Sequence, residues 1–134
     1  MKTEVGLWID HREAIVVTIN KNAAELRRVL SNVERQLQRS GDSPLKGPYE
    51  AQEVPADSAQ QRAYSEHLNV YYDALIASIR DADSIFIFGP GEAKVELKSR
   101  LEMHRLDGKI TAIETTDKMT DVQIEMKVKE HFSV

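Results

Sequence analysis

The sequence contains no cysteine, and this absence removes several kinds of chemistry at once. A chain without thiols forms no disulfide, holds no iron–sulfur cluster or thiolate zinc site, and has no cysteine nucleophile. Its apolar runs are also short, because none approaches the ~20 residues that a helix needs to cross a bilayer. Residues 1–4 include an acid and lead into a short apolar run without the cleavage site of a signal peptide. We therefore expect a cytoplasmic protein without a membrane partner.

Aromatic residues are few, at 6%, and no excess of positive charge is present. The 134 residues carry 18 Lys and Arg against 22 Asp and Glu, for a net charge of −4. This balance disfavours nucleic-acid binding by the molecule as a whole, so any contact with RNA must be regional. With 41% hydrophobic residues, the chain has the composition of a folded domain. Its length predicts a single domain over residues 1–134.

The most informative stretch is 84–94, where an apolar run stops at Gly89-Pro90-Gly91 and continues as a charged amphipathic segment. An apolar run without polar alternation is typical of a strand that is covered on both faces. Glycines at the corner let the backbone come close to another group. That group could be an anion, bound by backbone N–H groups together with Lys94, or a neighbouring strand. The glycine spacing fits neither the Walker motif nor the dinucleotide fingerprint, which favours the packing interpretation.

Hydrophobic periodicity along the rest of the chain predicts an α/β fold. The segments expected to form strands are 5–9, 14–19, 25–34, 84–88 and 110–115, and those expected to form helices are 57–80, 92–104 and one that begins at 120. Segment 25–34 also fits a helix, but a strand is preferred because the hairpin before it needs a further partner. Segment 39–57 is rich in glycine and proline, which predicts a long, mobile loop.

The order βββαβαβα predicts one mixed five-stranded sheet with strand order 3-2-1-4-5, and three helices distributed over both faces. This is the ribonuclease H-like layout. Asp10 would follow the first strand, at the edge where the carboxyl ends of the parallel strands meet. The glycine corner would lie beside it. A crevice at this edge is the usual place for a site in such sheets.

Asp10 and His11 are the candidates for catalysis, although both are weak. A nuclease with two metal ions needs several convergent carboxylates, and the nearest acid after the fourth expected strand is Glu92, which lies in a helix. The alternative is that Asp10 shapes the hairpin turn or pairs with Arg12. No two histidines have the spacing of metal ligands, so we expect neither a metal nor another cofactor.

A modest excess of positive charge follows the second expected strand. The cations of this segment outnumber its anions. The cations are Arg27, Arg28, Arg35, Arg39 and Lys46. Such residues can contact RNA phosphates and position an RNA partner. A solvated strand face with outward arginines explains the same pattern equally well.

Residues 88–97 (Phe-Gly-Pro-Gly-Glu-Ala-Lys-Val-Glu-Leu) resemble the strand-to-helix junction in the middle domain of class 1 release factors of archaea and eukaryotes and of the related Pelota proteins. They are even more similar to a bacterial group of small stand-alone relatives described as translational machinery proteins. The resemblance extends over nearly the entire chain, through segments 6–14, 71–83 and 114–132. It implies a ribonuclease H-like domain without the nuclease acids.

In release factors, the loop before the first long helix carries a Gly-Gly-Gln tripeptide that acts in the peptidyl-transferase centre. The corresponding segment here, 39–57, has no such tripeptide, and Gln52 and Gln60 do not follow paired glycines. The resemblance therefore implies a non-catalytic, translation-associated binding domain. It would contact the ribosome, through rRNA, tRNA or a ribosome-bound protein, by way of segments 27–39 and 40–53.

Two alternatives remain open at this stage. One is an enzyme, either a metal-dependent nuclease or a degenerate hydrolase, that uses Asp10. The other is a module for protein interaction alone, which predicts an apolar patch at an edge strand or on Tyr72.

Overall fold

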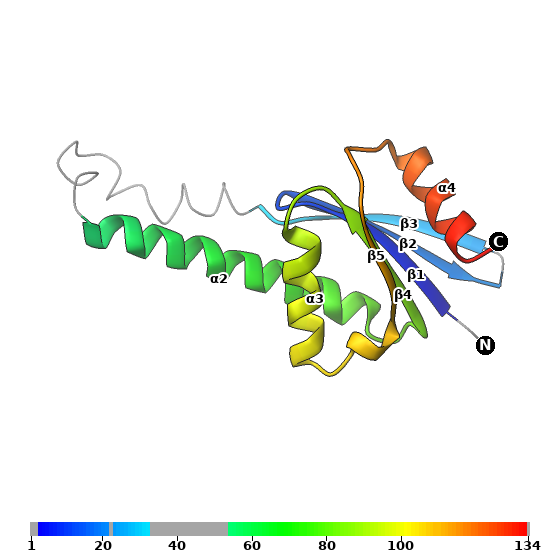
Figure 1. Cartoon of the computed structure of the whole chain (residues 1–134), viewed down its shortest axis with the longest axis horizontal. Coiled ribbons are helices and arrows are strands. Elements are labelled where there is room, and N and C mark those ends of the chain that lie inside the picture. The colour runs from blue at the N-terminus through cyan, green and yellow to red at the C-terminus, as the bar shows by residue number, and fades with distance from the viewer. Residues whose placement is uncertain (1–2, 22, 33–53, 134) are drawn as a thin grey trace.

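The computed structural model describes residues 3–21, 23–32 and 54–133, with side chains described in these ranges except at 54–61 (Figure 1). The strands are β1 (Thr3–Ile9), β2 (Glu13–Asn20), β3 (Ala23–Leu30), β4 (Ser84–Gly89) and β5 (Ile110–Thr115). The helices are α2 (Val54–Ile79), α3 (Ala93–Met103) and α4 (Asp121–His131), and a 3-10 turn, η2 (Asp107–Lys109), precedes β5. Among the described residues, no helix has the length and apolar character that a membrane span requires.

The strands form one mixed sheet in the order β3-β2-β1-β4-β5, which confirms the predicted order. The β1–β2 and β2–β3 pairs are antiparallel, whereas β1–β4 and β4–β5 are parallel. Helices α2 and α3 cover one face of the sheet and α4 covers the other (Figure 1). The edge strands are β3 and β5.

Alternation along the central strands divides the core into two layers. On β4, Ile85 and Ile87 pack toward α2 and α3, while Phe86 and Phe88 pack toward α4. Successive side chains of a strand point to opposite faces, so a strand covered on both faces has no polar positions. Trp8 of β1 lies in the α4 layer and is 1% exposed. The uninterrupted apolar run at 85–88 is therefore explained by helices on both sides.

Two element boundaries differ from the predictions by three residues or more. The first long helix begins at Val54 rather than at 57 or 58, so the end of the expected loop 39–57 is helical. Pro55 lies in the first turn of α2, where its missing N–H costs nothing, so the proline content of segment 39–57 does not exclude a helix start there. The expected third strand is confirmed over its first part and ends at Leu30; Asn32 has a φ of 54°. The rest of the expected loop lies outside the described residues.

The last helix begins as the sequence predicts. Thr120 Oγ1 accepts a 3.2 Å hydrogen bond from the backbone N–H of Gln123, and the Gln123 side chain accepts one of 2.9 Å from the Thr120 N–H. This reciprocal capping box fixes the start of α4, where Asp121 is ion-paired with Arg28 of β3.

Candidate functional site

The turn between β1 and β2 lies at the carboxyl edge of the parallel strands and is tightly held. Oδ1 of Asp10 accepts hydrogen bonds from the backbone N–H groups of Arg12 and Glu13, both at 2.8 Å. The Asp10 N–H donates to the Glu13 carbonyl at 3.0 Å. Ser31, just after β3, donates through Oγ to the His11 carbonyl at 2.7 Å. Asp10 thus has the turn-shaping role that we considered as the alternative to metal binding.

No group of three or more His, Asp and Glu side chains in the described part of the chain is arranged to hold a metal ion. The carboxylate of Asp10 faces its own turn, and the backbone carbonyl of Asp10 accepts a 3.1 Å hydrogen bond from the Tyr71 hydroxyl. The residues around Asp10 that the structure describes therefore give no support to a two-metal centre.

His11, the second residue of the turn, faces a groove between α2 and α3, which we call the α2–α3 groove. Its volume is about 340 Å³, and it is lined by His11, Tyr64, Ser65, Leu68, Asn69, Tyr72, Glu96, Ser99 and Arg100. Nε2 of His11 lies 3.1 Å from Oε1 of Glu96, and the Tyr72 hydroxyl donates to the same oxygen at 2.5 Å. The ring of Tyr64 stands edge-on to His11, with ring centroids 6.4 Å apart. A single carboxylate thus joins the turn, α2 and α3.

The two adjacent tyrosines are core residues whose hydroxyls reach polar partners. Burial raises the pKa of Tyr72 far above its ordinary value, and the hydrogen bond to Glu96 raises it further. Burial also raises the pKa of Tyr71, with the charge of Asp10 adding to the effect. Tyr72 is 2% exposed, so the expectation of an exposed apolar patch on this residue is wrong.

An ion pair forms one wall of the α2–α3 groove. The guanidinium of Arg100 on α3 binds both carboxylate oxygens of Asp73 on α2, at 2.8 Å and 2.6 Å. This hydrogen bonding lowers the pKa of Asp73. His104 approaches the same carboxylate at 3.6 Å. The positive charge of Arg100 is therefore engaged within the wall.

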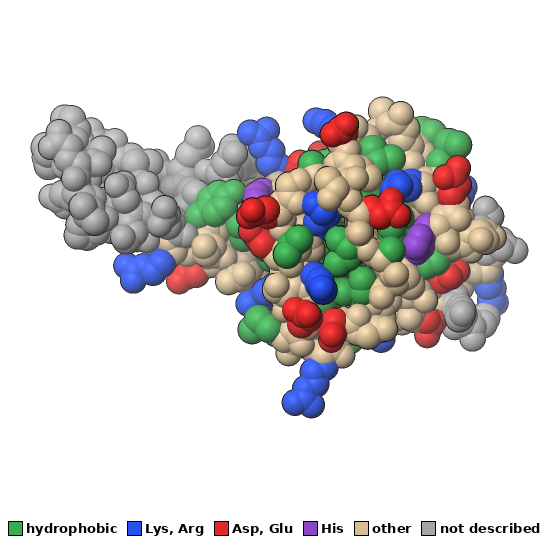
Figure 2. Space-filling view, viewed as in Figure 1, with side chains coloured by type: hydrophobic (Ala, Val, Ile, Leu, Met, Phe, Trp, Pro, Cys, Tyr) green, Lys and Arg blue, Asp and Glu red, His purple; other side chains and the backbone are tan. Residues whose placement is uncertain are grey.

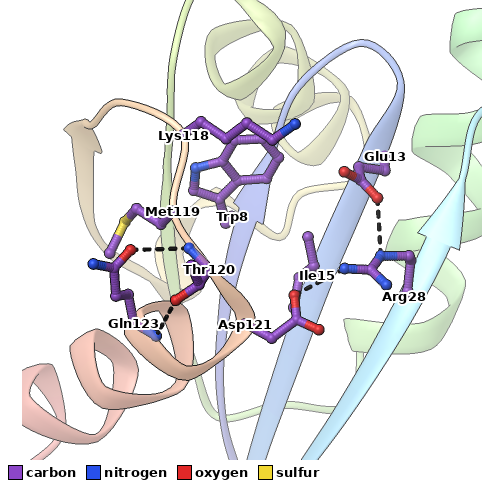
Figure 3. A pocket seen from close by; sticks show the side chains of 9 residues that line it. All are labelled: Trp8, Glu13, Ile15, Arg28, Lys118, Met119, Thr120, Asp121 and Gln123. Carbon is purple, nitrogen blue, oxygen red and sulfur yellow. Dashed lines mark hydrogen bonds and ion pairs between the residues drawn. The ribbon is translucent and has the colours of Figure 1, made fainter.

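A second groove lies on the other face of the sheet, at the start of α4; we call it the α4 groove (Figure 3). Its volume is about 530 Å³, and it is lined by Trp8, Glu13, Ile15, Arg28, Lys118, Met119, Thr120, Asp121 and Gln123. Arg28 bridges two acids here, with Nε 2.9 Å from Glu13 and Nη2 2.8 Å from Asp121. The groove therefore combines an apolar floor with charges that largely pair with each other (Figure 3).

The glycine corner after β4 is built for close packing. Gly89 has a φ of +147°, and a Cβ at this position would overlap the carbonyl oxygen of Ile9 on β1. Gly91 has a φ of +65° with open space around it. Lys94 is 7% exposed, and its ammonium group donates to the Gly91 carbonyl. Anion binding by Gly89, Gly91 and Lys94 stays a prediction. The ammonium group of Lys94 is bonded to the corner itself.

The two described arginines of the expected basic surface lie on opposite faces of the sheet. Arg27 is opposite Val16, on the face of α2 and α3, whereas Arg28 is opposite Ile15, on the face of α4. Arg28 is neutralised by its two acids, while Arg27 is exposed and has no hydrogen-bond or ion-pair partner among the described residues. The other expected cations, Arg35, Arg39 and Lys46, lie outside the described residues.

On the face of the molecule that Figure 2 shows, charges of both signs are interspersed over the described residues. Sequence reasoning missed Glu96, which lies at the centre of the α2–α3 groove. Glu96 is 85 residues from His11 and 24 from Tyr72, so no local pattern connects them. The available signal was the amphipathic character of α3, which places Leu97 in the core and leaves the adjacent Glu96 partly exposed.

No protein-family model and no curated protein matches the chain. Among solved structures, the Pelota protein of Thermoplasma acidophilum is similar with a TM-score of 0.61 and 13% identity, covering 96% of this chain and 32% of that protein. The archaeal translation termination factor aRF1 is similar with a TM-score of 0.59 and 11% identity, covering 98% of this chain and 35% of aRF1. Archaeoglobus fulgidus Pelota gives a TM-score of 0.54 at 11% identity, covering 96% of this chain and 31% of that protein.

These likenesses show that the chain has the fold of a Pelota/aRF1 domain. The chain spans about a third of the length of each of these proteins, with 32%, 35% and 31% covered. The fold implied by the sequence resemblance is thereby confirmed.

Proposed function

We propose that this chain is a translation-associated binding domain that contacts the ribosome through RNA or a ribosome-bound protein and catalyses no reaction. The observation that carries the proposal is the match of 98% of the chain to a domain-sized part of a translation termination factor. Such a role implies a cytoplasmic protein. That the chain acts as a stand-alone bacterial relative of these domains is part of the same proposal.

The non-catalytic part of the proposal rests on two observations. The sequence has no Gly-Gly-Gln tripeptide. In addition, Oδ1 of Asp10, the expected metal ligand of the enzyme alternative, is already bonded to two N–H groups of its own turn. The enzyme alternative therefore receives no support from the described geometry of Asp10.

The surface for RNA follows from the charges that remain available. Arg27 on the edge strand β3 is exposed and unpaired among the described residues, whereas Arg28 already binds Glu13 and Asp121. A phosphate contact by Arg28 would have to compete with the two carboxylates that already neutralise its charge. We propose that Arg27 contributes to an RNA contact together with the cations at 35, 39 and 46, and that Arg28 does not.

Sedimentation with ribosomes through a sucrose gradient tests the proposal. The protein should move with ribosomes at low salt, and its apparent affinity should fall as salt rises, because phosphate contacts release counterions. Replacing Arg27 by alanine should reduce the slope of log affinity against log salt by roughly one unit. The matched control, Arg28→Ala, should leave that slope unchanged.

The proposal is wrong if the protein stays at the top of the gradient at low salt, with vacant and with stalled ribosomes alike. If Arg28→Ala flattens the salt slope and Arg27→Ala does not, the assignment of the contact surface is reversed.

A further inference from the structure

We infer that the α2–α3 groove binds a positively charged side chain, an arginine or a lysine, presented by a partner protein. The inference deepens the proposed function, on which it rests only for the idea that the partner belongs to the translation apparatus. Its chemistry follows from Glu96 and from the charges and rings around it.

Glu96 offers a carboxylate oxygen that is already oriented and still available. Oε1 accepts hydrogen bonds from Tyr72 at 2.5 Å and engages His11 at 3.1 Å. Oε2 has no partner among the described residues, and the Glu96 side chain is 40% exposed. Two partners on one oxygen hold the carboxylate in place. Binding of a ligand to the other oxygen therefore costs little further side-chain entropy of Glu96. Charge-assisted hydrogen bonds from Arg or Lys to such an oxygen are among the strongest in proteins.

The charges that line the groove leave Glu96 without a permanent cation. Among the described residues that line the groove, Arg100 is the one with a permanent positive charge, and both oxygens of Asp73 bind its guanidinium. Nε2 of His104 also approaches Asp73, at 3.6 Å from Oδ1, and His104 is not one of the lining residues of the groove. The turn contributes His11, whose contact with Glu96 is a hydrogen bond that does not require a charged ring. The groove thus presents negative potential, which favours a cationic ligand over a phosphate.

The remaining walls suit the two ends of a long basic side chain. Leu68, which is 6% exposed, gives the groove an apolar element against which a methylene stem can pack. Tyr64 adds an aromatic ring, and cations are attracted to ring faces. The amide of Asn69 has no hydrogen-bond partner among the described residues. The volume of about 340 Å³ suits one inserted side chain rather than a folded surface.

Nuclear magnetic resonance with small probes tests this inference without a ribosome, so its result is independent of the co-sedimentation experiment. The probes are N-acetyl-arginine amide, N-acetyl-lysine amide and N-acetyl-citrulline amide; citrulline has nearly the shape of arginine but no charge. We expect saturable shifts of the His11 and Tyr64 ring signals with arginine or lysine in the millimolar range, and none with citrulline. Tighter binding of the arginine probe than of the lysine probe would indicate a planar contact through two hydrogen bonds.

Substitutions locate the binding. Glu96→Gln should lower the affinity for the arginine probe about tenfold, which is the loss expected for one charge-assisted hydrogen bond. The amide oxygen of the glutamine can still accept the hydrogen bond from Tyr72. Glu102→Gln, an exposed substitution on the same helix, is the matched control and should change nothing. Ser65→Arg should block the groove with its own side chain and abolish the shifts even if Glu96→Gln destabilises the fold.

The inference is overturned by any of three results. Citrulline binding as strongly as arginine would remove the role of charge. Shifts of His11 and Tyr64 with magnesium chloride but not with the arginine probe would assign the groove to a metal ion. Equal affinity of the arginine probe for the native protein and a folded Glu96→Gln variant would place the contact elsewhere.

Discussion

The hydroxyl of Tyr72 on α2 donates a 2.5 Å hydrogen bond to Oε1 of Glu96 on α3. His11 in the β1–β2 turn lies 3.1 Å from the same oxygen. Three elements that enclose the α2–α3 groove therefore meet at one atom. Because a buried hydroxyl without an acceptor is costly, the contact between Tyr72 and Glu96 fixes how α2 and α3 sit against each other at this end of the sheet.

The raised pKa values of Tyr71 and Tyr72 predict a loss of stability at high pH. A pKa raised by burial favours the protonated hydroxyl in the folded state, relative to the ordinary value of 10.0. This contribution is complete below pH 10 and is lost as the pH rises above it, because the unfolded chain then releases protons that the folded chain keeps. The free energy of unfolding, measured by denaturant titration, should therefore decline above about pH 10.

Ultraviolet absorbance of tyrosinate separates these two residues from the others. Tyr71 and Tyr72 should contribute no tyrosinate signal until circular dichroism shows that the chain unfolds. The variants Tyr71→Phe and Tyr72→Phe should therefore leave the absorbance change of the folded protein as it is. A smaller absorbance change in folded Tyr72→Phe would show that Tyr72 ionises in place.

The glycine corner predicts very different costs for two alanine substitutions. Gly89→Ala brings a Cβ against the Ile9 carbonyl at a φ of +147°, so β1 and β4 must separate locally. We expect a loss of at least about 3 kcal/mol in the free energy of unfolding, or failure to fold. Gly91→Ala carries only the strain of a left-handed φ of +65°, about 1 kcal/mol. Gly108→Ala, with open space and no such φ, is the neutral control.

Chemical denaturation of the three variants measures these costs. Similar losses for Gly89→Ala and Gly91→Ala would mean that the corner does not pack against β1 as described. In that case the anion-binding interpretation of the corner would regain weight.

Much of the fold follows from patterns that are local in the sequence. The apolar run before Gly89 predicts a central strand because both of its faces are covered, and the Thr120–Gln123 pair predicts the start of α4 because its hydrogen bonds span one turn. The predicted start of α2 is too late because the glycines and prolines of segment 39–57 indicate a loop, whereas Pro55 fits the first helical turn. Capping contacts can be recognised from a few residues, whereas the role of a proline depends on which turn it occupies.

The candidate site was harder to predict because its geometry is not local. Arg27 and Arg28 were counted together as positive charge, although strand alternation places adjacent residues on opposite faces. The contact of His11 with Glu96 depends on how α3 packs beside the β1–β2 turn, which no spacing in the sequence encodes. Composition measures the amount of charge, but the sheet determines which charges act together.

Close packing between β1 and α4 predicts a rescue by paired substitutions. A Cβ at Gly6 would overlap the side chain of Val128 on α4, which is fully buried. Gly6→Ala alone should therefore destabilise by about 1–3 kcal/mol through overpacking, and Val128→Ala alone by a similar amount through a cavity. The loss in free energy of unfolding of the double variant should be smaller than the sum of the two single losses. The reason is that the methyl group added at position 6 occupies part of the space vacated at position 128.

Thermal or denaturant unfolding of the four proteins in this cycle gives the coupling energy. Gly108→Ala combined with Val128→Ala is the control pair and should be additive, because Gly108 has open space around it. Additive losses for the Gly6 and Val128 pair would contradict direct contact between β1 and α4 at this point.

The ion pair between Arg100 and Asp73 predicts a small loss of stability at acidic pH. Hydrogen bonds from Arg100 lower the pKa of Asp73 below its ordinary value of 3.8, which favours the carboxylate in the folded state. The resulting stabilisation is present above the unfolded pKa and is lost as the pH falls through the lowered folded pKa. The Asp73 side chain is 44% exposed, so solvent screening limits the contribution to about 1 kcal/mol or less.

Arg100→Met should therefore raise the pKa of the Asp73 carboxyl toward 3.8, as measured by a carbon-13 carboxyl titration. The difference in the free energy of unfolding between native protein and variant should be largest near neutral pH. It should shrink as the pH falls from 3.8 through the lowered pKa of Asp73, below which both the folded and the unfolded chain bind the proton. Lys129→Met removes the cation of an exposed pair with Glu125 and should leave the Asp73 titration unchanged. An Asp73 pKa that is the same in native protein and Arg100→Met would show that the guanidinium does not hold this carboxylate in solution. The wall of the α2–α3 groove would then have a free cation near Glu96, and the preference of the groove for basic side chains would weaken with it.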